Sequence, residues 1–168
     1  MPEIAVKRIL IIRLSAIGDV VFASPLVAAC RQAHPSAEID WLAEGVVRPL
    51  LQDMPGLHKV VLWPRQEWEE LWREKRLIML ARAILKMRAL LRERQYDLVV
   101  DAQGLVKSAL LAWLTGARSR IGFKSKEPTG VLLTKRIEES ITPRISSEYL
   151  GLAEALSWST RDFDLVLG

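Results

Sequence analysis

Residues 9–25 constrain the fold more than any other segment of this 168-residue chain. The segment begins with four apolar residues, 9–12, three of them β-branched, and such a run is typical of a strand buried on both faces of a parallel sheet. A short loop, residues 15–18, follows, and helical spacing begins at Asp19. A strand, a loop and a helix in this order place polar groups at the carboxyl edge of an α/β sheet, where free backbone N–H groups favour an anion.

The loop lacks both of the common glycine motifs that bind nucleotide phosphates. Gly18 is its only glycine, so G-x-G-x-x-G and G-x-x-x-x-G-K-[ST] are both absent there. A carboxylate, Asp19, stands instead at the start of the helix. Two interpretations are open: Asp19 caps the helix, which its residue type favours, or it acts on a substrate hydroxyl group.

Pro25 interrupts the helix that begins at Asp19. Proline lacks an N–H donor and disfavours a helix interior by about 3 kcal/mol. We therefore expect a kinked but continuous helical element that runs to about residue 33, before Pro35 forbids continuation.

Apolar strands and helical segments alternate along the whole chain. We expect strands at 9–12, 38–43, 59–63, 96–101, 119–122 and 136–140, and further helices at 46–51, 64–76, 77–94, 109–115 and 147–158. This alternation predicts an α/β fold with a doubly wound, mostly parallel, Rossmann-like sheet and right-handed crossovers. A chain of this length has room for one such domain.

Ligands bind such sheets at the carboxyl ends of the strands, and four separated segments place polar side chains there. Asp19 follows the first strand, Glu44 follows the second, residues 101–108 follow the fourth, and residues 124–126 follow the fifth. We expect these segments to converge on one ligand.

Two of these segments carry several candidate ligand-binding groups. The first combines an acceptor, an amide, a cation and a hydroxyl group with a glycine that permits close backbone approach; these residues are Asp101, Gln103, Lys107, Ser108 and Gly104. Lys124 and Lys126 either clamp carboxylates or phosphates, or are merely solvated.

Trp68 and Trp72 lie four residues apart on one face of the helix expected at 64–76. In one interpretation this helix packs both tryptophans on the domain. In the other it is an interfacial segment that touches anionic lipid, and its solvated side carries the cations Arg65, Arg73, Lys75 and Arg76.

The helix expected at 77–94 carries one apolar stripe among many cations. The stripe consists of Leu80, Ile84, Met87 and Leu91, at helical spacing. We expect the stripe to lie in the core and the charges to be solvated.

The composition suits an anionic partner. The formal charge is +4 and the pI is about 9.5, a balance that fits nucleic acid, phospholipid or an acidic saccharide. The single cysteine, Cys30, indicates a reduced core residue of a cytoplasmic protein. We find no secretory signal peptide and no apolar run of the ~20 residues that a membrane span needs.

Three groups of residues together resemble motifs of the bacterial lipopolysaccharide heptosyltransferases, glycosyltransferase family 9. They are residues 15–19, Asp40-Trp41 with Glu44-Gly45, and residues 101–108, the last being more similar to heptosyltransferase I than to II. The resemblance covers essentially the whole chain. It implies the N-terminal half of a two-domain, B-type glycosyltransferase fold that moves heptose from ADP-heptose to the acidic sugar Kdo of the inner core.

The resemblance also implies roles for particular residues. Asp19 corresponds to the general base of an inverting, metal-independent displacement, and ADP-heptose is a donor substrate, so no cofactor is expected. Arg65 and Lys126 correspond to cations that bind the acceptor's carboxylates and phosphates; Lys126 stands where the family more often has arginine and loses bidentate geometry. With these, the predicted acceptor-binding residues are Ser15, Gly18, Glu44, Arg65, Asp101, Gln103, Gly104, Lys107, Ser108, Lys124 and Lys126.

We therefore expect residues 1–160 to form an acceptor-binding domain and 161–168 to begin an interdomain linker, with the donor-binding domain absent and this chain alone inactive. The expected partners are Kdo-lipid A, that missing domain and the inner leaflet of the cytoplasmic membrane, where the protein would be peripheral; nucleic acid is not expected. An alternative is a non-catalytic module that binds an anionic lipid-linked saccharide. A third interpretation, a nucleotide-binding or regulatory α/β domain, is disfavoured by the missing phosphate-loop glycines.

Overall fold

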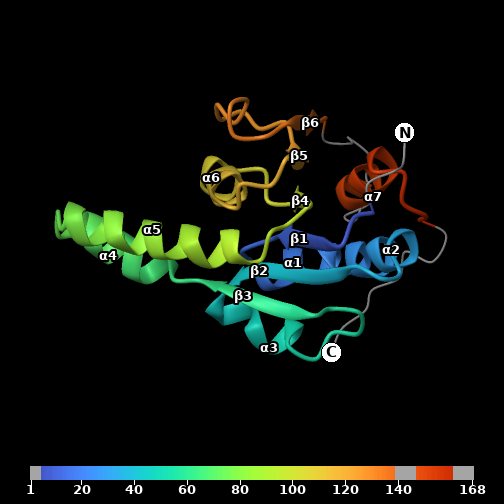
Figure 1. Cartoon of the computed structure of the whole chain (residues 1–168), viewed down its shortest axis with the longest axis horizontal. Coiled ribbons are helices and arrows are strands. Elements are labelled where there is room, and N and C mark those ends of the chain that lie inside the picture. Colours follow the sequence, from blue (N-terminus) through green and yellow to red (C-terminus); the bar gives the residue numbers. More distant parts are fainter. Residues whose placement is uncertain (1–4, 139–146, 161–168) are drawn as a thin grey trace.

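A six-stranded parallel sheet forms the centre of the protein (Figure 1). The computed structural model describes residues 5–138 and 147–160. Its strands are β1 (Arg8–Ile12), β2 (Glu38–Glu44), β3 (Lys59–Trp63), β4 (Leu98–Asp101), β5 (Ser119–Phe123) and β6 (Lys135–Ile137). The sheet order is β3-β2-β1-β4-β5-β6, and each neighbouring pair is parallel. The predicted α/β class and parallel sheet are confirmed.

Strand β1 lies inside the sheet and contains the apolar run of residues 9–12. It pairs with β2 along one edge and with β4 along the other. Residues 9–12 are 0% exposed, because helices cover both faces of the strand. Burial on both faces explains why this strand is uniformly apolar and does not alternate.

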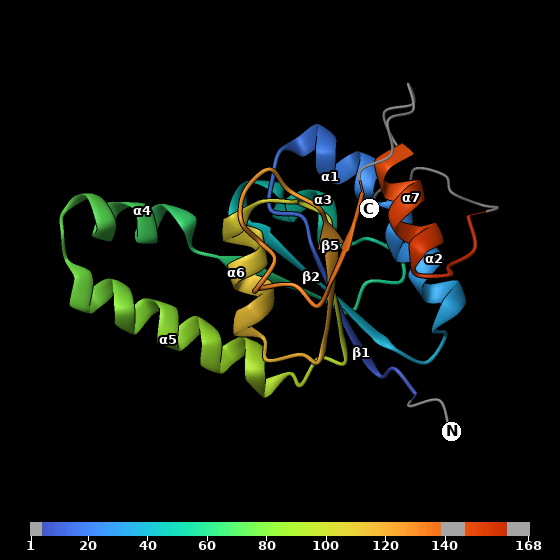
Figure 2. The same ribbon diagram turned by 90° about the horizontal axis from the view of Figure 1, so that it is seen from above.

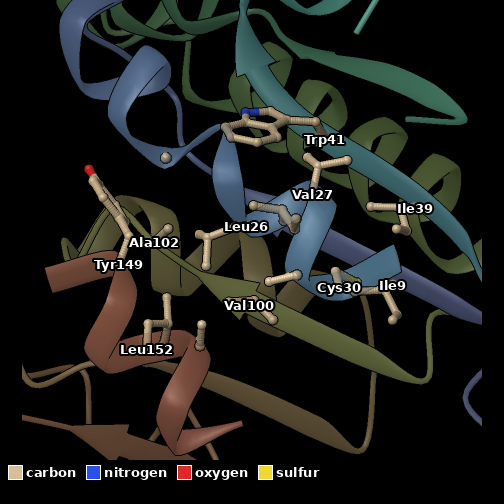
Figure 3. Close-up of a cluster of buried hydrophobic side chains, with 14 of the residues drawn as sticks. Ile9, Leu26, Val27, Cys30, Ile39, Trp41, Val100, Ala102, Tyr149 and Leu152 are labelled. Carbon is tan, nitrogen blue, oxygen red and sulfur yellow. The ribbon is translucent and has the colours of Figure 1, made fainter. Parts of the chain in front are cut away.

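Helices cover both faces of the sheet. They are α1 (Ile17–Ala23), α2 (Pro25–Ala33), the 3₁₀ helix η1 (Gly45–Val47), α3 (Arg48–Leu51), α4 (Arg65–Arg73), α5 (Leu77–Glu93), α6 (Val106–Leu114) and α7 (Ser147–Ala155). Ile9 and Ile11 pack with residues of α1, α2, α3 and α7, a cluster that Figure 3 shows around Leu26 and Leu152. Leu10 and Ile12 pack on the opposite face with α5 and α6. The predicted doubly wound arrangement is therefore confirmed.

The first helical element is kinked at the predicted place. Helix α1 begins at Ile17, two residues before Asp19, and α2 begins at Pro25. Ser24 between them keeps right-handed helical dihedral angles, so the helical backbone continues from α1 into α2. Cys30 on α2 is buried, and this burial raises the pKa of its thiol to about 12, as expected for an unreactive core residue.

Helices α4 and α5 form a hairpin that extends to one side of the sheet, as Figure 2 shows. Trp68 is buried and packs edge-to-face on Trp63, with 5.8 Å between ring centroids. Trp72, one turn later, is 68% exposed, so the interpretation in which both tryptophans pack on the domain holds only for Trp68.

The predicted core stripe of α5 is buried only in its second half. Met87 and Leu91 are buried, whereas Leu80 and Ile84 are half-buried. The first half of α5 lies beyond the edge of the sheet and packs mainly on α4, which leaves part of the stripe in contact with solvent.

The C-terminal elements agree with the predictions where the structure describes them. Strand β6 begins one residue before the predicted 136–140, whose last two residues lie outside the described ranges, as does the linker predicted at 161–168. Helix α7 ends at Ala155, three residues before the predicted end. Among the helices described, none is both long and apolar enough to cross a membrane.

A buried ionic network attaches the end of α5 to the sheet. Asp40 on β2 is 0% exposed, and its Oδ2 accepts from Arg94 Nε at 2.8 Å and from the Tyr96 hydroxyl at 2.7 Å. Burial opposes the charge on Arg94, but its hydrogen bond and charge interaction with Asp40 outweigh that effect and raise the pKa of the guanidinium. The network ties the C-terminal end of α5 to β2.

We expect Arg94→Met to lower the free energy of unfolding by about 3 kcal/mol, because it leaves the Asp40 carboxylate buried without its cation. Arg82→Met, at an exposed position of the same helix, is the matched control and should change it by less than about 0.5 kcal/mol. Urea unfolding followed by tryptophan fluorescence measures both values. Equal losses in the two variants would contradict an anchoring role for Arg94.

Candidate functional site

The loops that follow β1, β2 and β4 meet at the carboxyl edge of the sheet, as the sequence predicted. The Glu44 N–H donates to the Leu14 carbonyl at 3.0 Å, and the Leu14 N–H donates to Gln103 Oε1 at 3.0 Å. The Ala102 N–H donates to the carbonyl of Ile12 at 2.9 Å. Three segments far apart in the sequence are therefore joined by direct hydrogen bonds at this edge.

Asp19 is held at this edge by a buried arginine. Arg13 Nη2 lies 2.6 Å from Asp19 Oδ2, and Arg13 Nη1 donates to the Ala102 carbonyl at 3.1 Å. Arg13 is 9% exposed, whereas the Asp19 side chain is 48% exposed. The arginine thus links the carboxylate to the 101–108 corner, while the carboxylate itself faces solvent.

Both interpretations of Asp19 find support in its contacts. Its Oδ2 also accepts from the Ala16 N–H at 3.4 Å, which satisfies one free donor at the start of α1. Both contacts are made to Oδ2, and among the described residues nothing donates to Oδ1. One carboxylate oxygen therefore positions the side chain, and the other is open to a ligand.

A second group of charges continues the polar edge towards the hairpin. The Ser15 hydroxyl donates to Glu44 Oε1 at 3.3 Å, and Arg65 Nη1 lies 3.2 Å from the same oxygen. Arg65 also pairs with Glu69 at 2.5 Å; that hydrogen bond, followed by the charge of Glu44, raises the pKa of Arg65. Arg65 thus begins α4 as a partly exposed cation beside the Ser15–Glu44 contact.

Asp101 and Ser108 hold the 101–108 corner from within. Asp101 Oδ1 accepts from the N–H groups of Gln103 and Gly104, and the Ser108 hydroxyl donates to Asp101 Oδ2 at 3.0 Å. Both side chains are 0% exposed, so neither reaches the surface where a ligand would lie. Their place in the structure indicates that they shape the loop, which corrects the expectation of direct acceptor contact for these two residues.

The remaining predicted residues lie around this corner. Gly104 has a φ of 73° and its Cα faces Phe123, while Lys107 Nζ lies 5.9 Å above the ring of Trp63. Lys124 pairs with Glu138 at 3.0 Å on an exposed loop. Lys126 is exposed on the same loop, which Glu127 ties to α6 by accepting from the Val106 N–H at 2.6 Å.

A cleft of about 770 Å³ opens beside the Glu44–Arg65 pair, between the ends of β2 and β3 and the hairpin. Its walls are mostly apolar and include Val46, Leu62, Trp63, Trp68, Ala83, Met87 and Leu90. Polar groups lie on the side of Glu44 and Arg65, with Lys86 on α5. The polar edge that begins at Asp19 thus leads through Ser15 and Glu44 to an apolar cleft.

Arg13 and Tyr149 were not among the residues predicted for this site. The Arg13 guanidinium is buried under the site, and its Cζ lies 6.0 Å from the centroid of the Tyr149 ring. Tyr149 on α7 is 0% exposed, and burial raises the pKa of its hydroxyl. A charge directly after a buried strand was the signal that pointed to Arg13.

The charged side chains of the site are organised as carboxylate–guanidinium pairs. In the described part of the chain, no group of three or more His, Cys, Asp and Glu side chains is placed to hold a metal ion.

Burial makes the stability of the protein depend on the protonation of Asp101. Burial raises the pKa of Asp101 from 3.8 to about 6, against the opposing hydrogen bonds from Gln103, Ser108 and Gly104. Between these two pH values the native state binds the proton more tightly than the unfolded chain. The stabilisation that this proton provides is complete below about pH 4 and is lost as the pH rises through 6.

In the parent protein, we expect the free energy of unfolding to fall by up to about 3 kcal/mol between pH 4 and pH 7. Asp101→Asn keeps an acceptor for the loop N–H groups but cannot ionise, so this fall should be absent from the variant. Urea unfolding across this pH range measures the difference between the variant and the parent. Asp53→Asn, at an exposed position, is the control and should run parallel to the parent. A difference for Asp101→Asn that does not change with pH would contradict the raised pKa.

Comparisons with known proteins agree with the predicted resemblance. A family model described as glycosyltransferase family 9 (heptosyltransferase) matches residues 84–160. Lipopolysaccharide core heptosyltransferase OpsX of Haemophilus influenzae is 24% identical over 153 residues, which are 89% of this chain and 40% of that protein. Lipopolysaccharide heptosyltransferase 1 of Pseudomonas aeruginosa is 35% identical over 117 residues, 64% of this chain and 29% of that protein.

The fold also has a solved counterpart. The structure of Escherichia coli heptosyltransferase WaaC with ADP matches with a TM-score of 0.76 and 24% identity, covering 92% of this chain and 49% of that one. The matched part of this chain covers less than half the length of each of these three proteins. In sequence and in fold, the resemblance of this chain to the glycosyltransferase family 9 heptosyltransferases is confirmed.

Proposed function

We propose that this chain is the acceptor-binding part of a glycosyltransferase that moves heptose from ADP-heptose to Kdo of the lipopolysaccharide inner core. The observation that carries the proposal is the half-exposed Asp19 carboxylate, held by Arg13 where the loops of three parallel strands meet. The names of the relatives, which are lipopolysaccharide heptosyltransferases, support heptose transfer to a lipopolysaccharide.

In this proposal Asp19 is the general base. Asp19 Oδ1, to which no described residue donates, accepts the proton of the acceptor hydroxyl. The hydroxyl oxygen attacks the anomeric carbon of ADP-heptose at the same time. The new bond from oxygen to the anomeric carbon forms while the bond to the β-phosphate oxygen breaks and ADP leaves. Attack opposite to the leaving group inverts the anomeric centre.

Arg13 orients this base. Its Nη2 contacts Oδ2 of Asp19, so Oδ1 is left to face the acceptor hydroxyl. The ion pair also holds the carboxylate where the three loops meet.

The cations around the edge are proposed to bind the acid groups of the acceptor. Arg65 lies next to the Ser15–Glu44 contact, and Lys107 lies above Trp63, two residues before Arg65 in the sequence. Lys126 stands on an exposed loop, and Lys124 must leave Glu138 to take part. Gly18, Gln103 and Gly104 contribute backbone or amide groups, whereas Asp101 and Ser108 act by holding the loop.

The proposal also covers the partners of the chain. Residues 1–160 are proposed to belong to the acceptor-binding domain, and a donor-binding domain is proposed to complete the enzyme; this chain matches 40% and 29% of the lengths of the two relatives. Because the acceptor Kdo-lipid A is a membrane lipid, the protein works at the inner face of the cytoplasmic membrane.

A complementation assay tests the proposal. The chain is mixed with a separately made donor-binding part of a relative, ADP-heptose and Kdo-lipid A, and heptose transfer is followed by mass spectrometry. We expect transfer to require both proteins and to fall at least about 100-fold in Asp19→Asn, which keeps the shape of the side chain but removes the base. Asp53→Asn, an exposed aspartate distant in the sequence from these loops, is the matched control.

Each outcome of the assay has a distinct meaning. Unchanged transfer in Asp19→Asn would exclude this residue as the base. Binding of Kdo-lipid A without transfer, when the donor part binds ADP-heptose, would favour a non-catalytic module that recognises an anionic lipid-linked saccharide.

A further inference from the structure

Exposed apolar side chains are concentrated on the α4–α5 hairpin. Eleven large hydrophobic side chains are exposed in the part of the chain that the structure describes, and six of them lie on these two helices. These six are Trp72, Leu77, Ile78, Met79, Leu85 and Leu90. The hairpin extends beyond the sheet, so the rest of the domain does not cover them (Figure 2).

Four of these side chains gather where α4 turns into α5, in residues 72–82, which we term the hairpin tip. Ile78 is 75% exposed, Trp72 68%, Leu77 56% and Met79 46%. Single exposed apolar residues are ordinary on protein surfaces, but a group at the end of a projecting element marks a contact surface.

The hairpin is also the source of the positive charge of the protein. Residues 65–94 contain nine Lys and Arg against five Glu, a formal charge of +4 that equals the net charge of the whole chain. Within the tip, four cations stand beside a single glutamate: Arg73, Lys75, Arg76 and Arg82 against Glu74. Apolar and cationic side chains thus share one exposed surface.

A lysine, Lys75, stands in the turn of the hairpin at a position whose backbone conformation favours glycine. Lys75 has a φ of 56°, in the left-handed region, and its N–H donates to the Trp72 carbonyl at 3.1 Å. The Arg76 N–H reaches back to the Leu71 carbonyl at 2.9 Å and closes the end of α4. The closed turn holds Trp72 and Leu77 on either side of Lys75.

We propose that the hairpin tip docks on a phospholipid bilayer that contains anionic lipids. The apolar side chains of Trp72, Leu77 and Ile78 enter the boundary between headgroups and acyl chains, and the flanking cations bind lipid phosphates. Tryptophan suits this boundary because its ring is apolar and its N–H is polar. The long stems of Lys and Arg also let their charges remain at the headgroup level while the helix end sinks.

The charge pattern favours a bilayer over a second copy of this chain. Two tips that met would bring eight cations together with two glutamates, and like charges at close range repel. An anionic lipid surface instead attracts each cation by about 1 kcal/mol, and it needs no shape complementarity to the scattered apolar side chains.

Docking at the tip would also place the apolar cleft near the membrane, a consequence that rests on the proposed function. Met79 at the tip lies on the same face of α5 as Ala83, Met87 and Leu90 of the cleft wall, at spacings of four, eight and eleven residues. One apolar stripe of α5 therefore runs from the tip to the cleft beside Arg65. A lipid-linked acceptor would follow this stripe from the bilayer to the site.

The docking itself is tested with vesicles and the full chain, without donor or acceptor. We expect the chain to sediment with vesicles of phosphatidylcholine and phosphatidylglycerol, and at least tenfold less with phosphatidylcholine alone. Ile78→Glu should weaken binding to the anionic vesicles at least tenfold, because it puts a carboxylate among the lipids. Val131→Glu, a β-branched residue that is 90% exposed on another loop, is the matched control and should bind as the parent does.

A second measurement identifies the inserting side chain. Tryptophan emission should shift to shorter wavelength on anionic vesicles, and Trp72→Phe should abolish most of the shift. Circular dichroism checks that Ile78→Glu and Trp72→Phe stay folded. Equal binding by Ile78→Glu and Val131→Glu would overturn the proposal, and so would concentration-dependent dimerisation through the tip without vesicle binding. Loss of vesicle binding would leave the Asp19 transfer assay unaffected, since a detergent-dispersed acceptor needs no bilayer.

Discussion

The structure depends first on β1 being paired along both edges and covered on both faces. Because β2 lies on one side of β1 and β4 on the other, the chain reverses its direction across the sheet at this strand. The loops after β1, β2 and β4 consequently meet at the end of β1. The polar edge there is built from residues of three separate loops and not from one continuous motif. The parallel pairing thus creates the site, and the loop residues decide its chemistry.

A buried guanidinium organises the charges at that edge. Arg13 follows β1 directly and is almost inaccessible to solvent. A buried guanidinium is unfavourable unless it is paired, and Arg13 is paired with Asp19 and with the Ala102 carbonyl of the neighbouring corner. Its charge also opposes the rise in the pKa of Asp101 that burial causes. Arg13 therefore interacts with both carboxylates of the site. Asp19 faces solvent, where a ligand can reach it, whereas Asp101 is buried and supports the loop.

The hairpin shows why periodicity predicted some burial correctly and some wrongly. The spacing of Leu80, Ile84, Met87 and Leu91 indicated one apolar face, and the helix has that face. Only its second half meets the sheet, where Met87 and Leu91 are buried and Arg94 is anchored by Asp40. How far a helix extends beyond its sheet depends on where both ends are attached, and a pattern of spacing within the helix does not record this.

The sequence by itself determined the alternation of strands and helices, the parallel class of the sheet and the loops that carry polar residues, because each of these follows from local apolar runs, glycines and prolines. The family resemblance was carried separately by the motifs at residues 15–19, 40–45 and 101–108. Only the tertiary structure decided the strand order, the pairing of Asp19 with Arg13 and the burial of Asp101 and Ser108. It likewise decided that Trp68 packs inside while Trp72 faces solvent. The physical reason is that burial and ion pairing depend on contacts between distant segments, such as β1 with residues 101–108. These contacts give different surroundings to residues of the same type and spacing.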